Sequence, residues 1–181
     1  MDNVLRVSEQ MSFYAKEHNM NMTRSYLHFV RTTDGAPAVD DKALGFWRMY
    51  RYINNAVGKL VAESPLEAFK TAEAFGLFQG MLSGITGPRL VETIPSFHDT
   101  RKRFEKLERV AKEDKLGRFE ASKDVYEAIM EIKPYALALQ EAFDKGEIPE
   151  RVVHNDAKLS NILLDVNTGN AICVIDLDTC M

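Results

Sequence analysis

The stretch RVVHNDAKLSNILLDVNTGNAICVIDLDTCM, residues 151–181, decides the fold because it spaces two acids and an amide around a short hairpin. Its first half contains the pattern H-x-D-x-K-x-x-N of catalytic loops. Residues 162–164 and 171–175 have the composition of two short apolar strands, and residues 165–170 between them have the composition of a turn. The hairpin should therefore bring Asp176, the acid after the second strand, beside the loop.

The spacing of these polar residues indicates a phosphoryl-transfer site. In phosphoryl transfer the protein mainly orients the acceptor hydroxyl and holds metal ions against the phosphates. Asp156 fits the base that takes the hydroxyl proton, and Asn161, five residues later, fits a metal ligand. Asp176 occupies the place of the D-F-G aspartate, which holds Mg²⁺ through hard oxygen atoms. The triplet here is Asp-Leu-Asp without a glycine, so Asp178 is either a second metal ligand or an acid of the turn.

Each of these residues also has a plainer interpretation. The spacing D-x-x-x-x-N is common by itself and usually marks a turn or a helix cap. The histidine before it, the lysine within it and the two strands after it argue against coincidence. Lys158 could reach the transferred phosphate as a point charge or simply be solvated. His154 is interpreted as a buried residue that braces the loop, and a contact with the substrate is the alternative.

The order of histidine, aspartate, asparagine, hairpin and I-D resembles the aminoglycoside phosphotransferase and choline kinase superfamily, which has the protein-kinase-like fold. The segments HNDAKLSNILLD and CVIDLDT are most similar to the N-acetylhexosamine 1-kinase branch, as are GFWRMYRYI, AFGLFQGML, TIPSFHDTRKRF and IPERVVHND. The resemblance covers most of the chain. It implies an enzyme that uses ATP and Mg²⁺ to phosphorylate a small amino sugar. Asp156 and Lys158 would then be catalytic, and Asn161, Asp176 and Asp178 would hold the metal.

Two alternatives follow from the same motif. An aminoglycoside, choline or homoserine kinase would share the loop and differ in its acceptor pocket. A pseudokinase would keep the fold and bind ligands without turnover. The absence of a glycine-rich loop favours the pseudokinase, whereas the intact set of Asp156, Asn161 and Asp176 argues against it.

We expect an α+β chain with a partial protein-kinase-like fold. Residues 1–55 would be the remnant of the N-terminal lobe with the hinge, and residues 56–181 a partial helical C-terminal lobe with the catalytic loop and the metal-binding hairpin. A complete enzyme of this fold needs a glycine-rich turn and a strand lysine for the phosphates, and neither is recognisable before Trp47. The chain also stops five residues after Asp176. We therefore interpret it as a fragment that is inactive, or nearly so, in isolation.

Helical spacing of apolar residues predicts helices over residues 1–18, from Ser64 to the glycines at 84 and 87, after the loop at 94–104, and over residues 122–145. Ser64, with a proline after it and a glutamate three residues later, predicts a capping box. Pro134 should interrupt or kink the last helix.

Strand composition occurs at residues 25–32, at residues 38–39 and above all at residues 45–53, an aromatic-rich stretch that we expect to be a central strand. This strand would lead into the hinge, where Tyr52, Ile53 and Asn54 could contact the nucleotide. Ordinary core packing is the alternative for the aromatic residues.

The loop at residues 94–104 carries basic residues that could bind the acceptor. Arg101 and Arg103 could steer a phosphate or grip a sugar hydroxyl, with His154 as a further contact. Alternatively, these charges form the solvated face of a helix.

Composition excludes several classes of function. The 181 residues include 45% hydrophobic residues, enough for a core, and the net charge of −4 offers no footprint for nucleic acid or an anionic membrane. No apolar stretch approaches the ~20 residues that span a bilayer. Cys173 and Cys180 suit neither a disulfide framework nor a zinc site, so a cytoplasmic location is expected. Exposed apolar lobe surfaces would make self-association possible.

Overall fold

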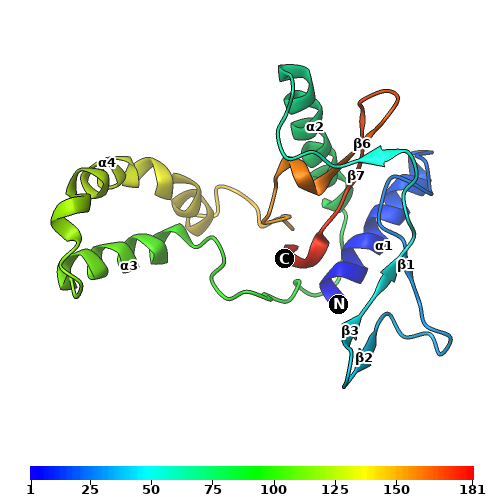
Figure 1. Ribbon diagram of the computed structural model, residues 1–181, viewed down its shortest axis with the longest axis horizontal. Helices are drawn as coiled ribbons and strands as arrows, with labels where there is room; N and C mark the ends of the chain where they lie inside the picture. Colours follow the sequence, from blue (N-terminus) through cyan, green and yellow to red (C-terminus); the bar gives the residue numbers. More distant parts are fainter. The chain divides into compact units, whose positions relative to one another are not determined.

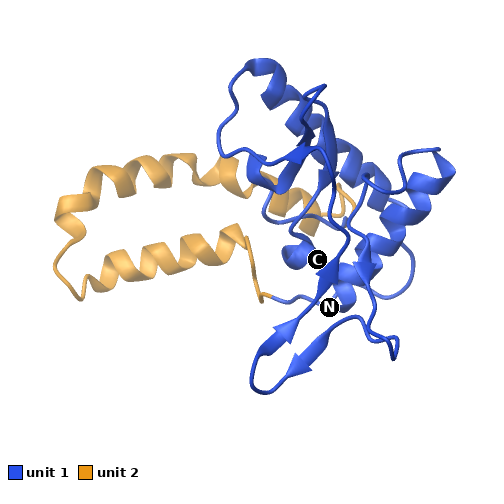
Figure 2. Cartoon of the chain, turned by 45° about the vertical axis from the view of Figure 1, so that its right-hand side comes forward, with its two compact units in different colours: residues 1–93, 151–181 blue, residues 94–150 orange.

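The computed structural model describes residues 1–181, which form two compact units (Figures 1 and 2). The first unit combines residues 1–93 with residues 151–181, and the second contains residues 94–150. The mixture of helices with small antiparallel sheets confirms the expected α+β class. The compact units do not follow the expected division after residue 55, and the assignment of residues 1–55 and 56–181 to two lobes stays a prediction.

Two long helices of the first unit begin and end close to where the sequence predicts. Helix α1 spans Asp2–Glu17, and its buried positions follow the expected helical spacing, with Val7, Met11 and Ala15 almost fully covered. Helix α2 spans Pro65–Leu82, and the Ser64 hydroxyl caps it by accepting the Glu67 amide at 3.2 Å. The Glu67 carboxylate accepts the amide of Glu63, one residue before the cap, instead of closing the expected box on Ser64.

The strands form three small antiparallel sheets. Strand β1 (Phe29–Val30) pairs with β4 (Met49–Tyr50), and β2 (Val39–Asp41) pairs with β3 (Gly45–Trp47). The third sheet has the order β5-β6-β7 and contains β5 (Ala56–Val57), β6 (Ile162–Asp165) and β7 (Ala171–Val174). The β6–β7 hairpin confirms the expected strand, turn and strand of the quoted stretch.

The expected central strand at residues 45–53 was wrong. Arg48 divides this stretch into β3 and β4, and each half pairs with only one neighbour. A central strand needs a partner on both edges, and without one the side chains of Phe46, Trp47, Met49 and Tyr50 remain at least half exposed. The aromatic composition indicated a strand correctly but could not indicate its neighbours. The strand predicted at residues 25–32 is also shorter, because only β1 forms a ladder there.

The core of the first unit lies where α1, α2 and the β6–β7 hairpin meet. Helix α2 contacts both α1 and β7, and α1 also contacts the short 3₁₀ helix η2 (Leu177–Thr179) that follows the hairpin (Figure 1). Its most completely covered side chains are Val7, Met11, Phe78, Ile162, Leu164, Leu177 and Cys180. Segments far apart in the sequence thus share one core, and the hairpin is anchored on two helices.

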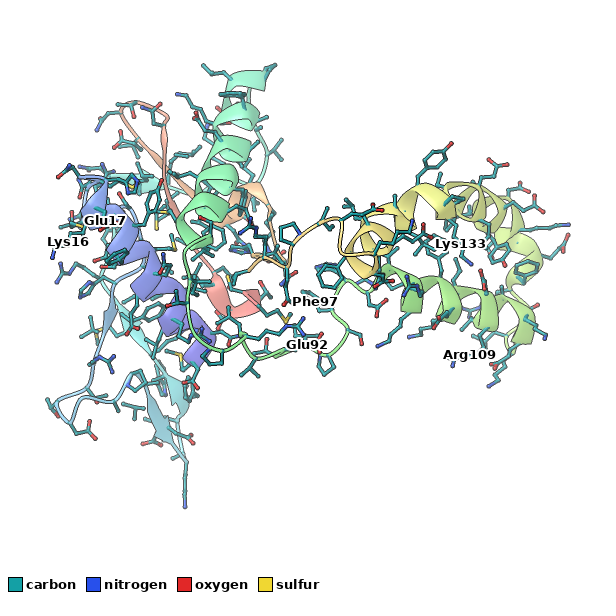
Figure 3. The ribbon with its side chains drawn as sticks, turned by 180° about the vertical axis from the view of Figure 1, so that it is seen from behind. Lys16, Glu17, Glu92, Phe97, Arg109 and Lys133 are labelled. Carbon is teal, nitrogen blue, oxygen red and sulfur yellow. The ribbon has the colours of Figure 1, made fainter.

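The second unit is a pair of helices, α3 (Thr100–Glu113) and α4 (Phe119–Asp144). Lys133 on α4 forms an ion pair with Glu108 on α3 and lies 5.6 Å from the centre of the Phe104 ring, and Figure 3 shows it on the side of α4 that faces α3. Pro134 lies inside α4 without ending it, so the helix is not interrupted there, and the alternative of a kink stays a prediction. Proline removes only one backbone donor, and the remaining turns continue. No helix of the chain is both long and apolar enough to cross a membrane.

An ion pair fixes the turn of the β6–β7 hairpin to the rest of the first unit. The Arg24 guanidinium donates to the Asp165 carboxylate at 2.8 Å and to the Asn55 carbonyl at 2.9 Å. The second carboxylate oxygen of Asp165 accepts the amides of Asn167 and Thr168 inside the turn. These contacts lower the pKa of Asp165 to about 2, with the Arg24 guanidinium as the largest cause. Arg24 therefore joins the turn to the residue that precedes β5.

We expect Asp165→Asn to destabilise the fold in a pH-dependent way. Because the folded chain lowers the pKa of Asp165, the ion pair contributes fully above about pH 4 and loses its contribution as the pH falls toward about 2. The variant should melt a few degrees below the wild type at neutral pH, and the difference should shrink through that window. Thermal unfolding followed by circular dichroism at several pH values measures this. Asp124→Asn, at an exposed position of α4, is the control, and a difference independent of pH would contradict the assignment.

Candidate active site

The predicted catalytic residues lie at the two ends of the β6–β7 hairpin. The 3₁₀ helix η1 (Leu159–Asn161) leads into β6, and η2 follows β7. Asn161 is therefore the last residue before the first strand, and Asp176 lies between the second strand and η2. Because β6 and β7 pair from Ile162 to Val174, these two ends of the hairpin are neighbours. The hairpin does bring the end of the loop and Asp176 together.

A closed ring of hydrogen bonds joins His154, Asp156, Asn161 and Ile175. The Asp156 amide donates to His154 Nδ1 at 3.3 Å, and His154 Nε2 contacts the Ile175 carbonyl at 2.8 Å. The Ile175 amide donates to the Asn161 carbonyl at 2.9 Å, and the Asn161 side-chain amide donates to the Asp156 carbonyl at 2.9 Å. Both backbone polar groups of Ile175, the residue directly before Asp176, are therefore bonded to the catalytic loop.

His154 is the buried member of this ring. Its side chain is 2% exposed, and the rings of Phe75 and Phe78 contact it edge-on at centroid distances of 5.5 and 5.6 Å. Since Nδ1 accepts the Asp156 amide, Nε2 carries the proton that is donated to Ile175. The Thr179 hydroxyl donates to the His154 carbonyl at 2.6 Å. Both ring nitrogens are thus committed inside the protein, which fits the bracing interpretation better than a substrate contact.

The Asp156 carboxylate has two donors from its own loop. Lys158 Nζ lies 2.6 Å from Asp156 Oδ2, and the Asn161 side-chain amide donates to the same oxygen at 3.1 Å. The Lys158 ammonium, as the largest cause, lowers the pKa of Asp156, and in return the Asp156 carboxylate raises the pKa of Lys158. Asp156 is therefore held ionised, as an acceptor of hydrogen bonds, and Lys158 is held as a cation at the same place.

Asn161 and Asp176 present oxygen atoms that suit a hard cation. The Asn161 amide nitrogen is used by Asp156, which leaves Oδ1 as the atom available to a metal. Asp176 is exposed and has the left-handed backbone conformation, with φ 61° and ψ 56°. Aspartate tolerates this conformation better than most residues. No cluster of three histidine, cysteine or acidic side chains forms a complete metal cage, and Mg²⁺ in phosphoryl transfer uses one or two protein ligands with phosphates supplying the others.

Asp178, the second candidate acid of the triplet, makes a different contact. Both of its carboxylate oxygens accept from the guanidinium of Arg48, with Nη1 to Oδ1 at 2.6 Å. The Arg48 guanidinium is the largest cause that lowers the pKa of Asp178. The structure thus separates the two acids, with Asp178 paired to an arginine and Asp176 exposed.

A shallow groove of about 370 Å³ opens beside the catalytic loop. Lys158 and Leu159 form one side, and Leu60, Ala72 and Phe75 belong to the other. Its walls are apolar apart from Lys158 and the hydroxyl of Thr71. Among the acids next to its lining in sequence, Glu63 and Glu67 are paired with Lys59 at 3.0 and 2.7 Å, and Asp156 is paired with Lys158 at 2.6 Å.

The other predicted site residues belong neither to the loop nor to the hairpin. Tyr52 is 77% exposed, whereas Ile53 belongs to the core and is 6% exposed. Of these two neighbours, the first therefore faces solvent and the second faces the interior. Asn54 is exposed, and the chain then turns into β5. Arg101 and Arg103 lie on α3 in the second unit, where the Arg101 guanidinium pairs with Asp144 at 2.6 Å.

Sequence reasoning missed three residues that hold the site in place. Arg48 pairs with Asp178, and Arg24 pairs with Asp165. Asn3, buried on α1, donates to the Cys180 carbonyl at 2.9 Å and exchanges two further hydrogen bonds with the backbone of Val91. A polar residue on the apolar face of an amphipathic helix was a usable signal for Asn3. The two arginines carried no comparable local signal.

One comparison with known families bears on this site. The model of the family described as "Phosphotransferase enzyme family" matches residues 6–181. The match includes the whole of the loop, the hairpin and the acids after it.

His154→Phe tests the hydrogen-bond ring. The substitution keeps an aromatic ring between Phe75 and Phe78 but leaves the Asp156 amide and the Ile175 carbonyl without partners. We expect the free energy of unfolding in urea to fall by about 2 kcal/mol, since each orphaned buried group costs roughly 1–3 kcal/mol. Amide exchange at Asp156 should also accelerate. His28→Phe, at an exposed histidine, should change neither quantity, and an unchanged exchange rate in His154→Phe would show that the ring does not hold the loop.

Proposed function

The chain belongs to the phosphotransferase enzyme family, and from that premise we propose that its full-length form transfers the γ-phosphoryl group of ATP to a hydroxyl of an N-acetylhexosamine, giving a sugar 1-phosphate. The observation that carries the proposal is the hydrogen-bond ring, because it ties the backbone of Asp156 to that of Ile175, directly before Asp176, and its member Asn161 also donates to the Asp156 carboxylate. Preorganised acceptors and ligands are what phosphoryl transfer requires of a protein.

In this mechanism Asp156 orients the acceptor hydroxyl through a hydrogen bond and takes its proton. The acceptor oxygen forms a bond to the γ-phosphorus, the bond from that phosphorus to its bridging oxygen breaks, and ADP leaves. The lowered pKa of Asp156, caused mainly by Lys158, makes the carboxylate a weak base. It therefore accepts the proton late, when the hydroxyl has become acidic by bonding to phosphorus. Lys158 is then placed to contact the transferred phosphoryl group.

Asn161 and Asp176 would hold the Mg²⁺ that accompanies ATP. When bound, the metal neutralises charge on the phosphate oxygens. The chain contributes two hard oxygen donors, the Asn161 Oδ1 and the Asp176 carboxylate, joined through the Ile175 peptide. Tyr52, Ile53 and Asn54 remain the stretch that we propose for contact with the nucleotide base. Because Tyr52 is exposed and Ile53 is buried, backbone groups rather than side chains would make this contact.

Two observations support a neutral acceptor with an apolar face. The segments HNDAKLSNILLD and CVIDLDT resemble the N-acetylhexosamine 1-kinase branch. The groove beside Lys158 has apolar walls, and Glu63 and Glu67 near it are already paired with Lys59. A polycationic aminoglycoside would need free carboxylates, so it fits this groove less well. Cys173 and Cys180 are free buried thiols, in keeping with the proposed cytoplasmic location.

The first test is consumption of ATP by the full-length protein with Mg²⁺, against a panel of N-acetylhexosamines, neutral hexoses, choline and aminoglycosides. We expect turnover on an N-acetylhexosamine only. Asp156→Asn should reduce kcat by about 10²–10⁴-fold, the usual contribution of a general base, and Asp124→Asn should leave it unchanged. Turnover on choline or an aminoglycoside would show that the acceptor belongs to another class of compound. Binding of ATP without turnover on any acceptor would favour a pseudokinase.

A second test addresses the metal. Asp176→Asn keeps the shape of the side chain and its tolerance of the left-handed conformation but removes the charge. The Mg²⁺ concentration for half-maximal rate should rise by about tenfold or more, as expected when metal binding is disturbed. Titration of the rate with Mg²⁺ measures this at a fixed concentration of ATP. An unchanged Mg²⁺ dependence with lower kcat would remove Asp176 from the metal site.

A further inference from the structure

The ion pair between Arg48 and Asp178 joins two parts of the first unit that are far apart in the sequence. The planar guanidinium meets the carboxylate with two parallel hydrogen bonds, one of them 2.6 Å long, across 130 positions of sequence. The side chain of Arg48 is 27% exposed and that of Asp178 is 47% exposed. Such two-pronged contacts fix orientation as well as distance, which a single ammonium contact does not.

We propose that Arg48 is a positioning residue that holds the Asp176–Asp178 turn through Asp178, so that Asp178 is the anchor of the turn and Asp176, rather than Asp178, receives the cation. The part about the cation rests on the proposed function. The part about the anchor rests on the fold alone.

Arg48 makes a second contact besides its ion pair with Asp178. It lies between β3 and β4, and its guanidinium is 5.8 Å from the centre of the Phe29 ring, a cation–π contact. Phe29 in turn pairs with Tyr50 across the β1–β4 ladder. Arg48 therefore contacts β1 through the Phe29 ring and is joined directly to β4 along the chain. The largely exposed β1–β4 pair thereby supports the residue that binds Asp178.

Contacts from outside support the turn, whose own backbone forms a hydrogen bond from the Cys180 amide to the Leu177 carbonyl at 3.2 Å. Asp176 is in the left-handed conformation, which a residue with a side chain occupies at some cost. The helix η2 that follows has only three residues, and Leu177 is the buried side chain within it. Asp176 and Asp178 also bring two negative charges into one turn. The Arg48 guanidinium neutralises one of them, and without it the two carboxylates would repel each other.

A double-mutant cycle in the protein without metal tests the anchor. Arg48→Met and Asp178→Asn should each accelerate amide exchange at Val153 and Cys180 by about fivefold, the factor expected for a partly exposed, two-pronged ion pair. These amides bond to Met181 and Leu177 around the turn. The double variant should exchange no faster than either single variant. Arg48→Lys, which keeps the charge without the planar fork, should lie between Arg48→Met and the wild type.

The control is Arg31→Met, because Arg31 pairs loosely with Glu9 at 3.7 Å in the same unit. It should leave the exchange rates at Val153 and Cys180 unchanged. Melting temperatures of all variants verify that each one folds. Additive effects of Arg48→Met and Asp178→Asn, or no effect at all, would overturn the anchor.

Binding of Mn²⁺ to the full-length protein in the presence of ADP, followed by electron paramagnetic resonance, tests which acid receives the cation. Arg48→Met and Asp178→Asn should weaken Mn²⁺ binding by the same factor, about fivefold, and Asp176→Asn should weaken it far more. The opposite pattern, tighter binding in Arg48→Met and weaker binding in Asp178→Asn, would make Asp178 a ligand that Arg48 competes for and would overturn the proposal. If the wild type bound no Mn²⁺ with ADP, the proposed function would fail, and the exchange rates would still decide the anchor.

Discussion

The hydrogen-bond ring around His154 is the constraint on which the rest of the site depends. A histidine can donate from one nitrogen and accept at the other, so it is able to link an amide of the loop to a carbonyl of the strand end. Its burial between Phe75 and Phe78 keeps water from competing for these bonds. The ring connects η1 and the catalytic loop to Ile175, the residue directly after β7. Helix α2, which supplies Phe75 and Phe78, packs against α1 in the core.

The parts that could be predicted from the sequence are those encoded by neighbouring residues. The N-cap of α2, the apolar face of α1 and the β6–β7 hairpin each follow from a few consecutive positions, because capping, periodicity and turn chemistry are local effects. The candidate site is predictable for the same reason. Asp156, Asn161 and the hairpin belong to one short stretch, and the hairpin itself returns the chain to Asp176.

The parts that could not be predicted depend on partners chosen across long separations. Arg24 meets Asp165 and Arg48 meets Asp178 over more than a hundred residues, and neither arginine differs in sequence from any exposed arginine. The prediction of a central strand at residues 45–53 was wrong for a related reason. Its composition favours a strand, but whether a strand is central is decided by what pairs with it, and here β3 and β4 each find one partner.

The left-handed backbone at Asp176 restricts which residues evolution could place there. Glycine would occupy this conformation most easily but carries no carboxylate. Glutamate carries the charge but lacks the short side chain that lets aspartate and asparagine adopt the conformation. Asparagine adopts it without the charge. The position therefore admits a single residue type if both the shape of the turn and an anionic ligand are required, and the adjacent Leu177, almost fully buried, limits any local adjustment that could widen the choice.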